Sequence, residues 1–283
     1  MINPSFWKGK RVFVTGHTGF KGGWMCLWLR QLGVEVIGYS LKPATVPSLF
    51  EVASVGEGMQ SIIGDIRDHA KLSKTILGSK PDLVIHMAAQ PLVRYSYAQP
   101  AETYEVNVMG TIYLLEAVRA TPSVKAVVNV TSDKCYENQE KGLPFKEDDK
   151  LGGLDIYSAS KACSEILTKA YYKSFFEKKI NISTARAGNI IGGGDFGDDR
   201  IIPDLVDAIV NNKYLEVRSP KSIRPWQHVL EPLSGYLSLG KMLMNRELKS
   251  NIIPNWNFGP YKRNCKKVCD RSDVIWVYIG RGS

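Results

Sequence analysis

A glycine-spaced run near the start of the chain constrains the fold more than any other feature. Gly16, Gly19 and Gly22 follow directly on the apolar stretch 11–14, and the helical pattern 24–29 comes next. A strand, a glycine turn and a helix in this order can hold a pyrophosphate, because the helix presents free N–H groups and the positive end of its dipole. Gly16 suits the tight turn, Gly19 the close approach of the backbone, and Gly22 the packing of helix on strand. We therefore expect a dinucleotide-binding unit; the alternative is an ordinary glycine-rich turn.

Short β-branched runs alternate with helical patterns over the first two thirds of the chain. Strands separated by helices of about 10–15 residues indicate βαβ units and a parallel sheet, which right-handed crossovers make doubly wound. We expect strands at 34–39, 83–86, 124–130 and 181–185, and helices at 70–77, 101–119 and 158–176. Residues 1–187 are therefore predicted to form a Rossmann-type α/β domain whose ligand groups gather at the carboxyl ends of the strands.

The last third of the chain has a different character. From residue 188 onward the regular alternation weakens, a glycine triplet occupies 192–194, and helical patterns appear at 203–210 and 232–243. We expect residues 188–283 to form a smaller substrate-binding region that packs over the ligand edge of the sheet and is able to interleave with the first domain.

The composition, with 44% hydrophobic and 23% charged residues, is that of an ordinary globular protein. No apolar run approaches the roughly 20 residues that span a bilayer, and no secretory signal is recognised, so a cytoplasmic protein without a membrane partner is expected. Five scattered cysteines predict no disulfide framework, and no histidine has ligand spacing to Cys265 and Cys269, so no metal is expected. The net charge of +9 is spread along the chain, which favours anionic small molecules over nucleic acid.

The residues of the expected cofactor site do not distinguish NAD from NADP. The second strand ends at residues 40–42 without the acid that usually binds the adenosine ribose, and the lysine there could favour the extra phosphate of NADP. Asp65 is predicted to accept a hydrogen bond from the adenine amino group or, equally, to be a turn aspartate. Ala88 and Ala89 end a strand where small side chains let a flat ligand lie against the backbone. His86, just before them, is more simply a core histidine.

Tyr157 and Lys161 are the first pair that could carry chemistry. They lie four residues apart and therefore share one face of the expected helix. A free tyrosine is a poor base at neutral pH, and a nearby ammonium is expected to lower its pKa by stabilising the phenolate. The pair could then take a proton from a sugar hydroxyl while a hydride leaves the same carbon. The pattern alone is common on helices, so its weight comes from the nucleotide site that precedes it.

Ser132, Asp133 and Lys134 form a second group, at the end of the strand 124–130. Ser132 is predicted to hydrogen-bond the hydroxyl that Tyr157 deprotonates. Asp133 and Lys134 offer a carboxyl and an amine side by side, which could serve as an acid and a base at one substrate. A solvated Asp–Lys pair in a loop is the alternative.

The glycine run together with Tyr157-x-x-x-Lys161 resembles the extended short-chain dehydrogenase/reductase family. Within that family, Ser132-Asp133-Lys134 resembles the acid/base segment of nucleotide-sugar 4,6-dehydratases. The longer segments 22–24, 132–136, 186–195 and 223–232 are similar to the branch that acts on CDP-glucose. The resemblance extends from about residue 6 to about residue 260.

This resemblance implies a closed redox cycle on CDP-glucose. Tyr157 removes the C4 hydroxyl proton as a hydride passes to NAD, water is lost across C5 and C6, and the hydride returns to C6. NAD is expected because the cycle regenerates it in place. Asp133 is the implied acid. Lys134 stands where relatives that use dTDP-sugars carry a glutamate base, so it is expected either to act as the C5 base or to assist Asp133 electrostatically. A lysine base needs burial or a cationic neighbour.

The resemblance also assigns binding residues. The catalytic set is Ser132, Asp133, Lys134, Tyr157 and Lys161. The NAD-binding set is Gly16, Thr18, Gly19, Phe20, Gly22, Asp65, Ile66, Ala88, Ala89, Gln90, Asn107, Thr131, Tyr157, Lys161 and Arg186. The substrate-binding set is Gln90, Asn189, Arg200, Arg224 and His228, of which the arginines suit phosphate and would otherwise be surface ion pairs. A homodimer or homotetramer through the helices 101–119 and 158–176 is implied as well.

Two other functions remain open at this stage. A nucleotide-sugar epimerase of the same fold needs Tyr157 and Lys161 but not Asp133 and Lys134. A non-catalytic, truncated NAD-binding homologue is the other, because this family usually continues well past the motif at 256–260. The short tail is expected to leave Trp276, Val277 and Ile279 without part of their partner surface, and NAD binding to survive better than turnover.

Overall fold

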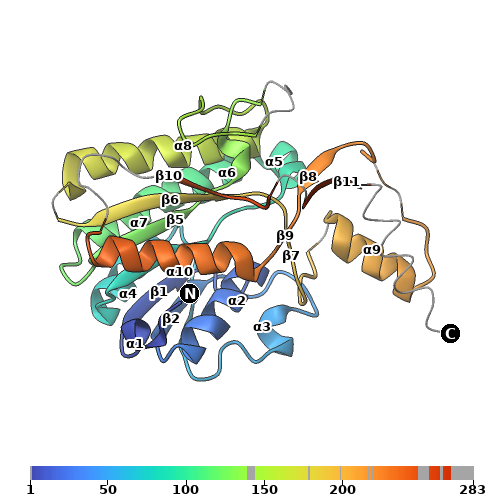
Figure 1. Ribbon diagram of the computed structural model, residues 1–283. Coiled ribbons are helices and arrows are strands. Elements are labelled where there is room, and N and C mark those ends of the chain that lie inside the picture. Colours follow the sequence, from blue (N-terminus) through green and yellow to red (C-terminus); the bar gives the residue numbers. More distant parts are fainter. Residues whose placement is uncertain are drawn as a thin grey trace.

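The computed structural model describes residues 2–138, 144–177, 179–197, 199–215, 217, 219–247, 255–261 and 264–268. Its centre is a seven-stranded parallel sheet in the order β3-β2-β1-β4-β5-β6-β10 (Figure 1). The strands are β1 (Arg11–Thr15), β2 (Glu35–Ser40), β3 (Gln60–Ile63), β4 (Leu83–His86), β5 (Ala126–Val130), β6 (Asn181–Ala187) and β10 (Asn255–Phe258). Strand order runs outward from β1 in both directions, which is the Rossmann arrangement, so the predicted fold class is confirmed.

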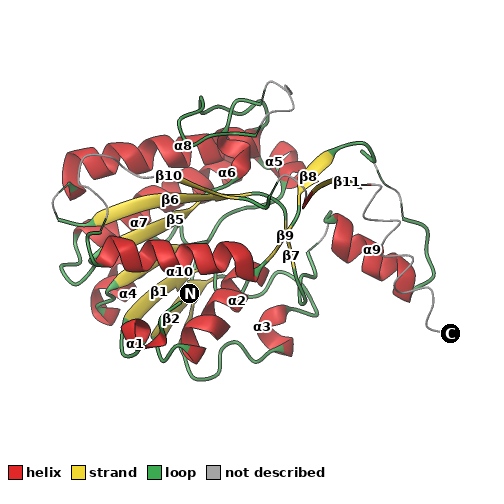
Figure 2. Ribbon diagram, viewed as in Figure 1, coloured by secondary structure: helices red, strands yellow, loops and turns green. Residues whose placement is uncertain are grey.

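Helices cover both faces of this sheet (Figure 2). The helices α2 (Phe20–Gln31) and α10 (Leu230–Met244) contribute to the core on one face, and α4 (His69–Ser79), α7 (Gly110–Arg119) and α8 (Ile156–Tyr171) cover the other. Alternate strand residues supply the two cores: Val12 and Val14 join the first, and Phe13 joins the second. The shorter helices are α1 (Pro4–Trp7), α3 (Leu49–Val52), α5 (Val93–Ala98), α6 (Pro100–Tyr104), α9 (Ile201–Val210) and a 3-10 turn at Asp133–Cys135.

The two long predicted helices are each modified by a π-helical segment. The path from 101 to 119 consists of α6, a π segment at Glu105–Met109 and α7. Likewise, α8 continues into a π segment at Tyr172–Phe176. Such segments widen the helix locally and occur often at functional sites. The first of them contains Asn107, whose contacts are described below.

The chain after residue 187 contributes both to the ligand edge and to the Rossmann layers. Residues 190–191 (β7) and 227–228 (β9) pair beyond the end of β6, and 223–225 (β8) pairs with 265–267 (β11), beside α9. However, α10 packs against β5 and β6, and β10 is the seventh strand of the main sheet. The last third of the chain therefore interleaves with the Rossmann layers and does not lie wholly over the ligand edge. The tail positions Trp276, Val277 and Ile279 lie outside the described residues.

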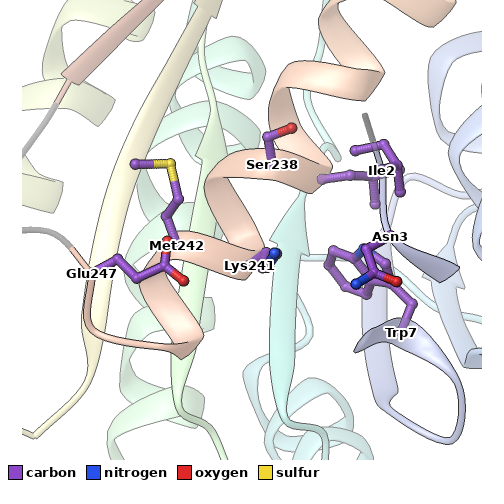
Figure 3. A pocket seen from close by; sticks show the side chains of 8 residues that line it. Ile2, Asn3, Trp7, Ser238, Lys241, Met242 and Glu247 are labelled. Carbon is purple, nitrogen blue, oxygen red and sulfur yellow. The ribbon is translucent and has the colours of Figure 1, made fainter. Parts of the chain in front are cut away.

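A cavity of about 150 Å³ lies between α1 and the second half of α10 (Figure 3). Trp7, Lys241 and Glu247 are among the residues that line it. Because α1 leads into the amino end of β1, this cavity is at the opposite edge of the sheet from the predicted site. In the described part of the chain, no helix is long and apolar enough to cross a membrane, and no three His, Cys, Asp or Glu side chains gather as a metal site would require.

Candidate active site

The glycine turn between β1 and α2 is shaped to admit an anion. Gly16 has a φ of +76°, which favours glycine, and a Cβ there would lie 2.9 Å from the Ala88 backbone nitrogen. A Cβ on Gly22 would lie 2.1 Å from the carbonyl oxygen of Gly16, so this glycine packs the helix on the turn itself. The N-cap Gly19 offers no side-chain cap and the first turn of α2 holds no acid, which leaves that helix end open to a pyrophosphate. These features fit a dinucleotide.

Thr18 ties this turn to the end of β2. Its hydroxyl donates to the Leu41 carbonyl at 2.9 Å and lies 2.9 Å from the Ser40 hydroxyl. The Thr18 hydroxyl is therefore hydrogen-bonded within the protein. It can assist cofactor binding by holding the glycine turn in place. Phe20 begins α2, and its contact with the cofactor stays a prediction.

Asp65 forms the turn contacts that the alternative interpretation expected. Its carboxylate accepts from the Arg67 backbone nitrogen at 2.8 Å and pairs with the Arg67 guanidinium at 2.6 Å. These interactions with Arg67 hold the pKa of Asp65 below its usual range. The neighbouring Ile66 is buried and fits against Gly110, where a Cβ would lie 2.8 Å from it. A contact of Asp65 with adenine stays a prediction.

His86 is a core histidine, as the simpler interpretation held. Its Nδ1 lies 2.7 Å from the Thr15 hydroxyl oxygen, and burial lowers its pKa to about 3. The Thr15 hydroxyl also accepts from the backbone nitrogen of Ala88 at 3.0 Å. This bracing fixes the backbone of Ala88 and Ala89 where β4 ends, next to the glycine turn.

Gln90 and Asn107 position each other, and their predicted contacts with the cofactor and, for Gln90, the substrate stay predictions. The Gln90 amide nitrogen donates to the Thr103 hydroxyl at 2.9 Å, and its carbonyl oxygen accepts from the Leu92 backbone nitrogen. Asn107 is 2% exposed and spans the Gln90 backbone and the Ser160 hydroxyl. Asn107 thus joins the loop after β4 to α8. Its side-chain oxygen and nitrogen both have hydrogen-bond partners within the protein.

Ser132, Asp133 and Tyr157 meet at the carboxyl end of β5. The Ser132 hydroxyl donates to Asp133 Oδ1 at 3.1 Å and caps the short 3-10 turn by accepting from the Lys134 backbone nitrogen. Tyr157, in the first turn of α8, is buried beside them. Burial raises its pKa to about 12 and Asp133 adds to the rise, whereas the hydrogen bond with Ser132 and the charge of Arg200 lower it.

The prediction that Lys161 lowers the pKa of Tyr157 is therefore wrong for this structure. Burial dominates, and the cation that acts on the phenol is Arg200. Lys161 is itself buried one turn further along α8, and its own pKa is lowered to about 8 for that reason. Tyr157 and Lys161 share a face of α8, as their spacing predicts. The burial of Tyr157, however, has a larger effect on its pKa than a nearby charge has.

Asp133 and Lys134 lie in opposite environments. Burial raises the pKa of Asp133, against the charges of Lys134 and Arg224, so a proton is retained more readily on this carboxyl. Lys134 is exposed and does not meet the burial condition for a lysine base. The charge of Lys134 does act on Asp133, which supports the electrostatic role, and the choice between the two roles stays a prediction.

The predicted substrate residues divide into two groups. The charges of Arg200 and Arg224 lower the pKa values of Tyr157 and Asp133 respectively, which supports a place for both cations near the predicted reacting groups. Arg200 also pairs with Asp195 at 2.9 Å, the ion pair considered as its alternative. Asn189 and His228 lie in the β7–β9 segments nearer to α2: the Asn189 carbonyl accepts from Gln227 at 3.1 Å, and the His228 ring lies 6.4 Å from Trp24.

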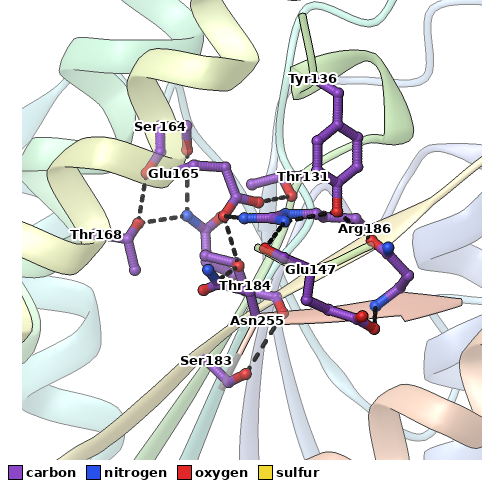
Figure 4. Close-up of polar contacts among 12 residues, drawn as sticks. Thr131, Tyr136, Glu147, Ser164, Glu165, Thr168, Ser183, Thr184, Arg186 and Asn255 are labelled. Carbon is purple, nitrogen blue, oxygen red and sulfur yellow. Dashed lines mark hydrogen bonds and ion pairs between the residues drawn. The ribbon is translucent and has the colours of Figure 1, made fainter. Parts of the chain in front are cut away.

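Arg186 and Thr131, both predicted to contact NAD, have their side chains in an internal network instead (Figure 4). The Arg186 side chain is 1% exposed and pairs with Glu165 at 2.7 Å, while its other terminal nitrogen donates to the Tyr136 hydroxyl at 2.6 Å. The Thr131 hydroxyl donates to the same carboxylate of Glu165. A buried charge needs its partner, so this arginine joins β6 to α8, and a contact of Arg186 or Thr131 with NAD stays a prediction.

Lys21 also belongs to the site, although no role is predicted for it from the sequence. It is the second residue of α2, and its ammonium lies 5.9 Å from the centroid of the Tyr236 ring. Burial lowers its pKa to about 7, helped by the charges of Lys161 and Arg200 and opposed by Asp133. The sequence feature that could have indicated its place in the site is a lysine inside the glycine run, at the start of the helix that follows the turn.

A Rossmann sheet with an open glycine turn, and with serine, tyrosine and lysine together at its carboxyl edge, defines an extended short-chain dehydrogenase/reductase. The family described as GDP-mannose 4,6-dehydratase matches residues 13–253. The chain is 50% identical, over 98% of its length and 79% of the relative's, to CDP-glucose 4,6-dehydratase of Salmonella typhimurium. The chain belongs to this family of nucleotide-sugar 4,6-dehydratases.

More distant relatives and solved structures agree on the fold. A dTDP-glucose 4,6-dehydratase of Xanthomonas campestris is 29% identical over 76% of this chain and 63% of its own length. The structure of dTDP-glucose 4,6-dehydratase from Bacillus anthracis in complex with NAD has a TM-score of 0.79 at 23% identity, covering 97% of this chain and 82% of that one. An epimerase of Methanothermobacter thermautotrophicus has a TM-score of 0.83 at 22% identity, covering 99% and 80%.

Proposed function

We propose that this protein converts CDP-glucose to CDP-4-keto-6-deoxyglucose with NAD as a resident cofactor. The observation that carries the reaction type is the half-buried carboxyl of Asp133, which accepts a hydrogen bond from Ser132 next to Tyr157 and has a raised pKa. The identity to the Salmonella CDP-glucose 4,6-dehydratase supports the choice of nucleotide. The open turn at Gly16, Gly19 and Gly22 supports a dinucleotide.

Each residue has a part in this reaction. Ser132 and Arg200 oppose the rise that burial causes in the pKa of Tyr157, and they stabilise its phenolate when the Tyr157 oxygen takes the proton of the C4 hydroxyl. When bound, NAD supplies the acceptor for the C4 hydride and gives it back to C6. Asp133 donates its proton to the C6 hydroxyl so that water can leave. Lys161, buried on α8, would hold the ribose of the cofactor.

Incubation of the purified protein with CDP-glucose, followed by mass spectrometry, tests the proposal. Loss of one water from the nucleotide sugar is expected, and deuterium placed at C4 should reappear at C6. An unchanged mass from protein that retains NAD would favour the non-catalytic alternative. Loss of the C4 deuterium to solvent would refute the internal return of the hydride.

We further propose a homodimer, or a tetramer built from such dimers. The helices α7 and α8 lie on one face of the sheet, and apolar side chains on and next to them remain exposed in the single chain: Met109 by 38%, Ile166 by 57% and Phe175 by 45%. Exposed apolar side chains on one face favour association. A cytoplasmic location is part of the proposal, and the free thiols of Cys26, Cys135, Cys163 and Cys265 support a reducing compartment.

A further inference from the structure

The buried ion pair between Glu165 on α8 and Arg186 on β6 is hydrogen-bonded to residues on both sides of Asp133 (Figure 4). Both side chains are 1% exposed, and the paired atoms are 2.7 Å apart. The Thr131 hydroxyl, two residues before Asp133, donates to the Glu165 carboxylate. The Tyr136 hydroxyl, three residues after Asp133, accepts from the Arg186 guanidinium at 2.6 Å. One ion pair therefore holds the chain on either side of the predicted acid.

The same ion pair belongs to the helix that carries the other predicted reacting groups. Glu165 follows Lys161 by about one turn of α8 and Tyr157 by about two. Its hydrogen bond with Thr131 joins this helix to the carboxyl end of β5. The bond therefore helps to set how far α8 lies from the end of β5. The separation between Tyr157 and Asp133 depends on that distance.

Tyr136 is held from further sides as well. Its hydroxyl donates to the Asn257 side chain of β10 at 2.7 Å, and its ring stacks on Phe145 with the ring centroids 4.6 Å apart. Arg186 also donates to the Glu147 carbonyl at 3.0 Å, so it fixes the loop from which Phe145 comes. The 3-10 turn at 133–135 is thus anchored by segments that lie far apart in the sequence.

We propose, on the basis of the proposed dehydration, that Glu165 and Arg186 are positioning residues for the elimination of water. Through Thr131 and Tyr136 they fix where Asp133 delivers its proton, and they exchange no proton with the substrate themselves. Proton donation to a leaving hydroxyl needs hydrogen-bond distance, and a misplacement of about 1 Å can slow such a step by about 100-fold. Oxidation at C4 does not use this carboxyl, so the two steps should respond differently.

Two substitutions remove one hydrogen bond of this network each and leave the ion pair in place. Thr131→Val removes the hydroxyl that contacts Glu165, and Tyr136→Phe removes the hydroxyl that contacts Arg186. Each variant should form dehydrated product about 10-fold more slowly and keep oxidation at C4 within about 3-fold. Absorbance at 340 nm in a single turnover reports the oxidation, and mass spectrometry of the sugar nucleotide reports the product. A variant that is only less stable would lose both steps in equal proportion.

Thr121→Val is the matched control. Thr121 is also buried and donates one hydrogen bond, to the Ala117 carbonyl at 2.8 Å, but it lies before the amino end of β5, at the opposite edge of the sheet. This variant should leave the ratio of the two steps unchanged. Equal slowing of both steps in Thr131→Val or Tyr136→Phe would overturn the proposal. Product formation within about 3-fold of the unaltered protein in either variant would do so too.

A double-mutant cycle tests whether the network acts through Asp133. Tyr136→Phe, introduced into Asp133→Asn, should slow product formation no further, because the carboxyl that Tyr136 positions is already gone. A further slowing of about 10-fold in the double variant would show that the two residues act independently. That result would overturn the positioning role.

A measurement without substrate separates this proposal from the proposed function. Burial raises the pKa of Asp133, against the charges of Lys134 and Arg224. A loosened turn in Tyr136→Phe should therefore lower that pKa toward the ordinary value of about 3.9. NMR of isotope-labelled aspartate carboxyl carbons, assigned with Asp133→Asn, follows the titration, and an unchanged pKa would overturn the positioning role. If the unaltered protein leaves CDP-glucose intact, the proposed function fails, and this titration alone decides whether the network positions Asp133.

Discussion

At the scale of single residues, Asp133 separates dehydration from epimerisation. Both reactions can use Tyr157, but only the first needs an acid for the C6 hydroxyl. Asp133 is held by Ser132 and packs at Gly188, where a Cβ would lie 2.9 Å from its carboxylate. This enclosure raises the pKa of the carboxyl, so its position and its chemistry have the same cause.

Asp133→Asn should keep oxidation at C4 and lose dehydration. We expect product formation to fall by about 10²–10⁴-fold, since the amide cannot donate an acidic proton to the leaving hydroxyl. Single-turnover absorbance at 340 nm and mass spectrometry of the sugar nucleotide measure the two steps separately. An unchanged rate of turnover in Asp133→Asn would contradict the dehydratase mechanism and favour an epimerase.

His86 should make the fold sensitive to acid. Burial lowers its pKa from 6.5 to about 3 in the folded protein. Between these values the unfolded chain binds more protons than the native one, so the free energy of unfolding falls as the pH drops from about 6.5 toward 3. In His86→Gln this slope should be shallower, as urea unfolding at several pH values can measure. His69→Gln, on the surface of α4, is the matched control, and an equal change in both variants would contradict the assignment.

At the scale of elements, the contact between α2 and the glycine turn decides whether the cofactor can bind. Gly22→Ala would place a methyl group 2.1 Å from the Gly16 carbonyl oxygen, so helix and turn must separate. We expect NAD affinity to fall by at least about 10-fold, measured by isothermal titration on cofactor-free protein. Gly78→Ala is the control, because a Cβ there meets nothing within 4 Å. It should leave NAD affinity unchanged and stabilise the protein by up to about 1 kcal/mol.

The elements α10 and β10 show which features of the fold sequence periodicity predicts and which it does not. The period of α10 was visible in the sequence, but its partner, the face of β5 and β6, was not. The strand β10 has four residues, Asn255–Phe258, without a β-branched side chain. Its strand character comes from pairing in parallel with β6, a contact between segments about 70 residues apart.

At the scale of the whole molecule, assembly should depend on the face formed by α7 and α8. Ile166→Glu places a charge on the exposed part of α8 and should shift the protein to monomers, measured by light scattering after size-exclusion chromatography. Leu77→Glu, on α4 and 51% exposed, is the matched control. Equal masses for both variants and the unaltered protein would place the interface elsewhere or exclude one.

Local periodicity and spacing along one strand or helix were enough to predict the parallel sheet and the glycine turn, and the resemblance of short motifs grouped Ser132, Asp133, Tyr157 and Lys161. Which charged side chains are enclosed depends on packing between distant segments. This packing placed Arg186 against Glu165 in the core, exposed Lys134 and buried the amine of Lys21 among other cations. A side chain's pKa and its availability depend on desolvation and on charges from distant segments, and neither is set by the residue's neighbours in sequence.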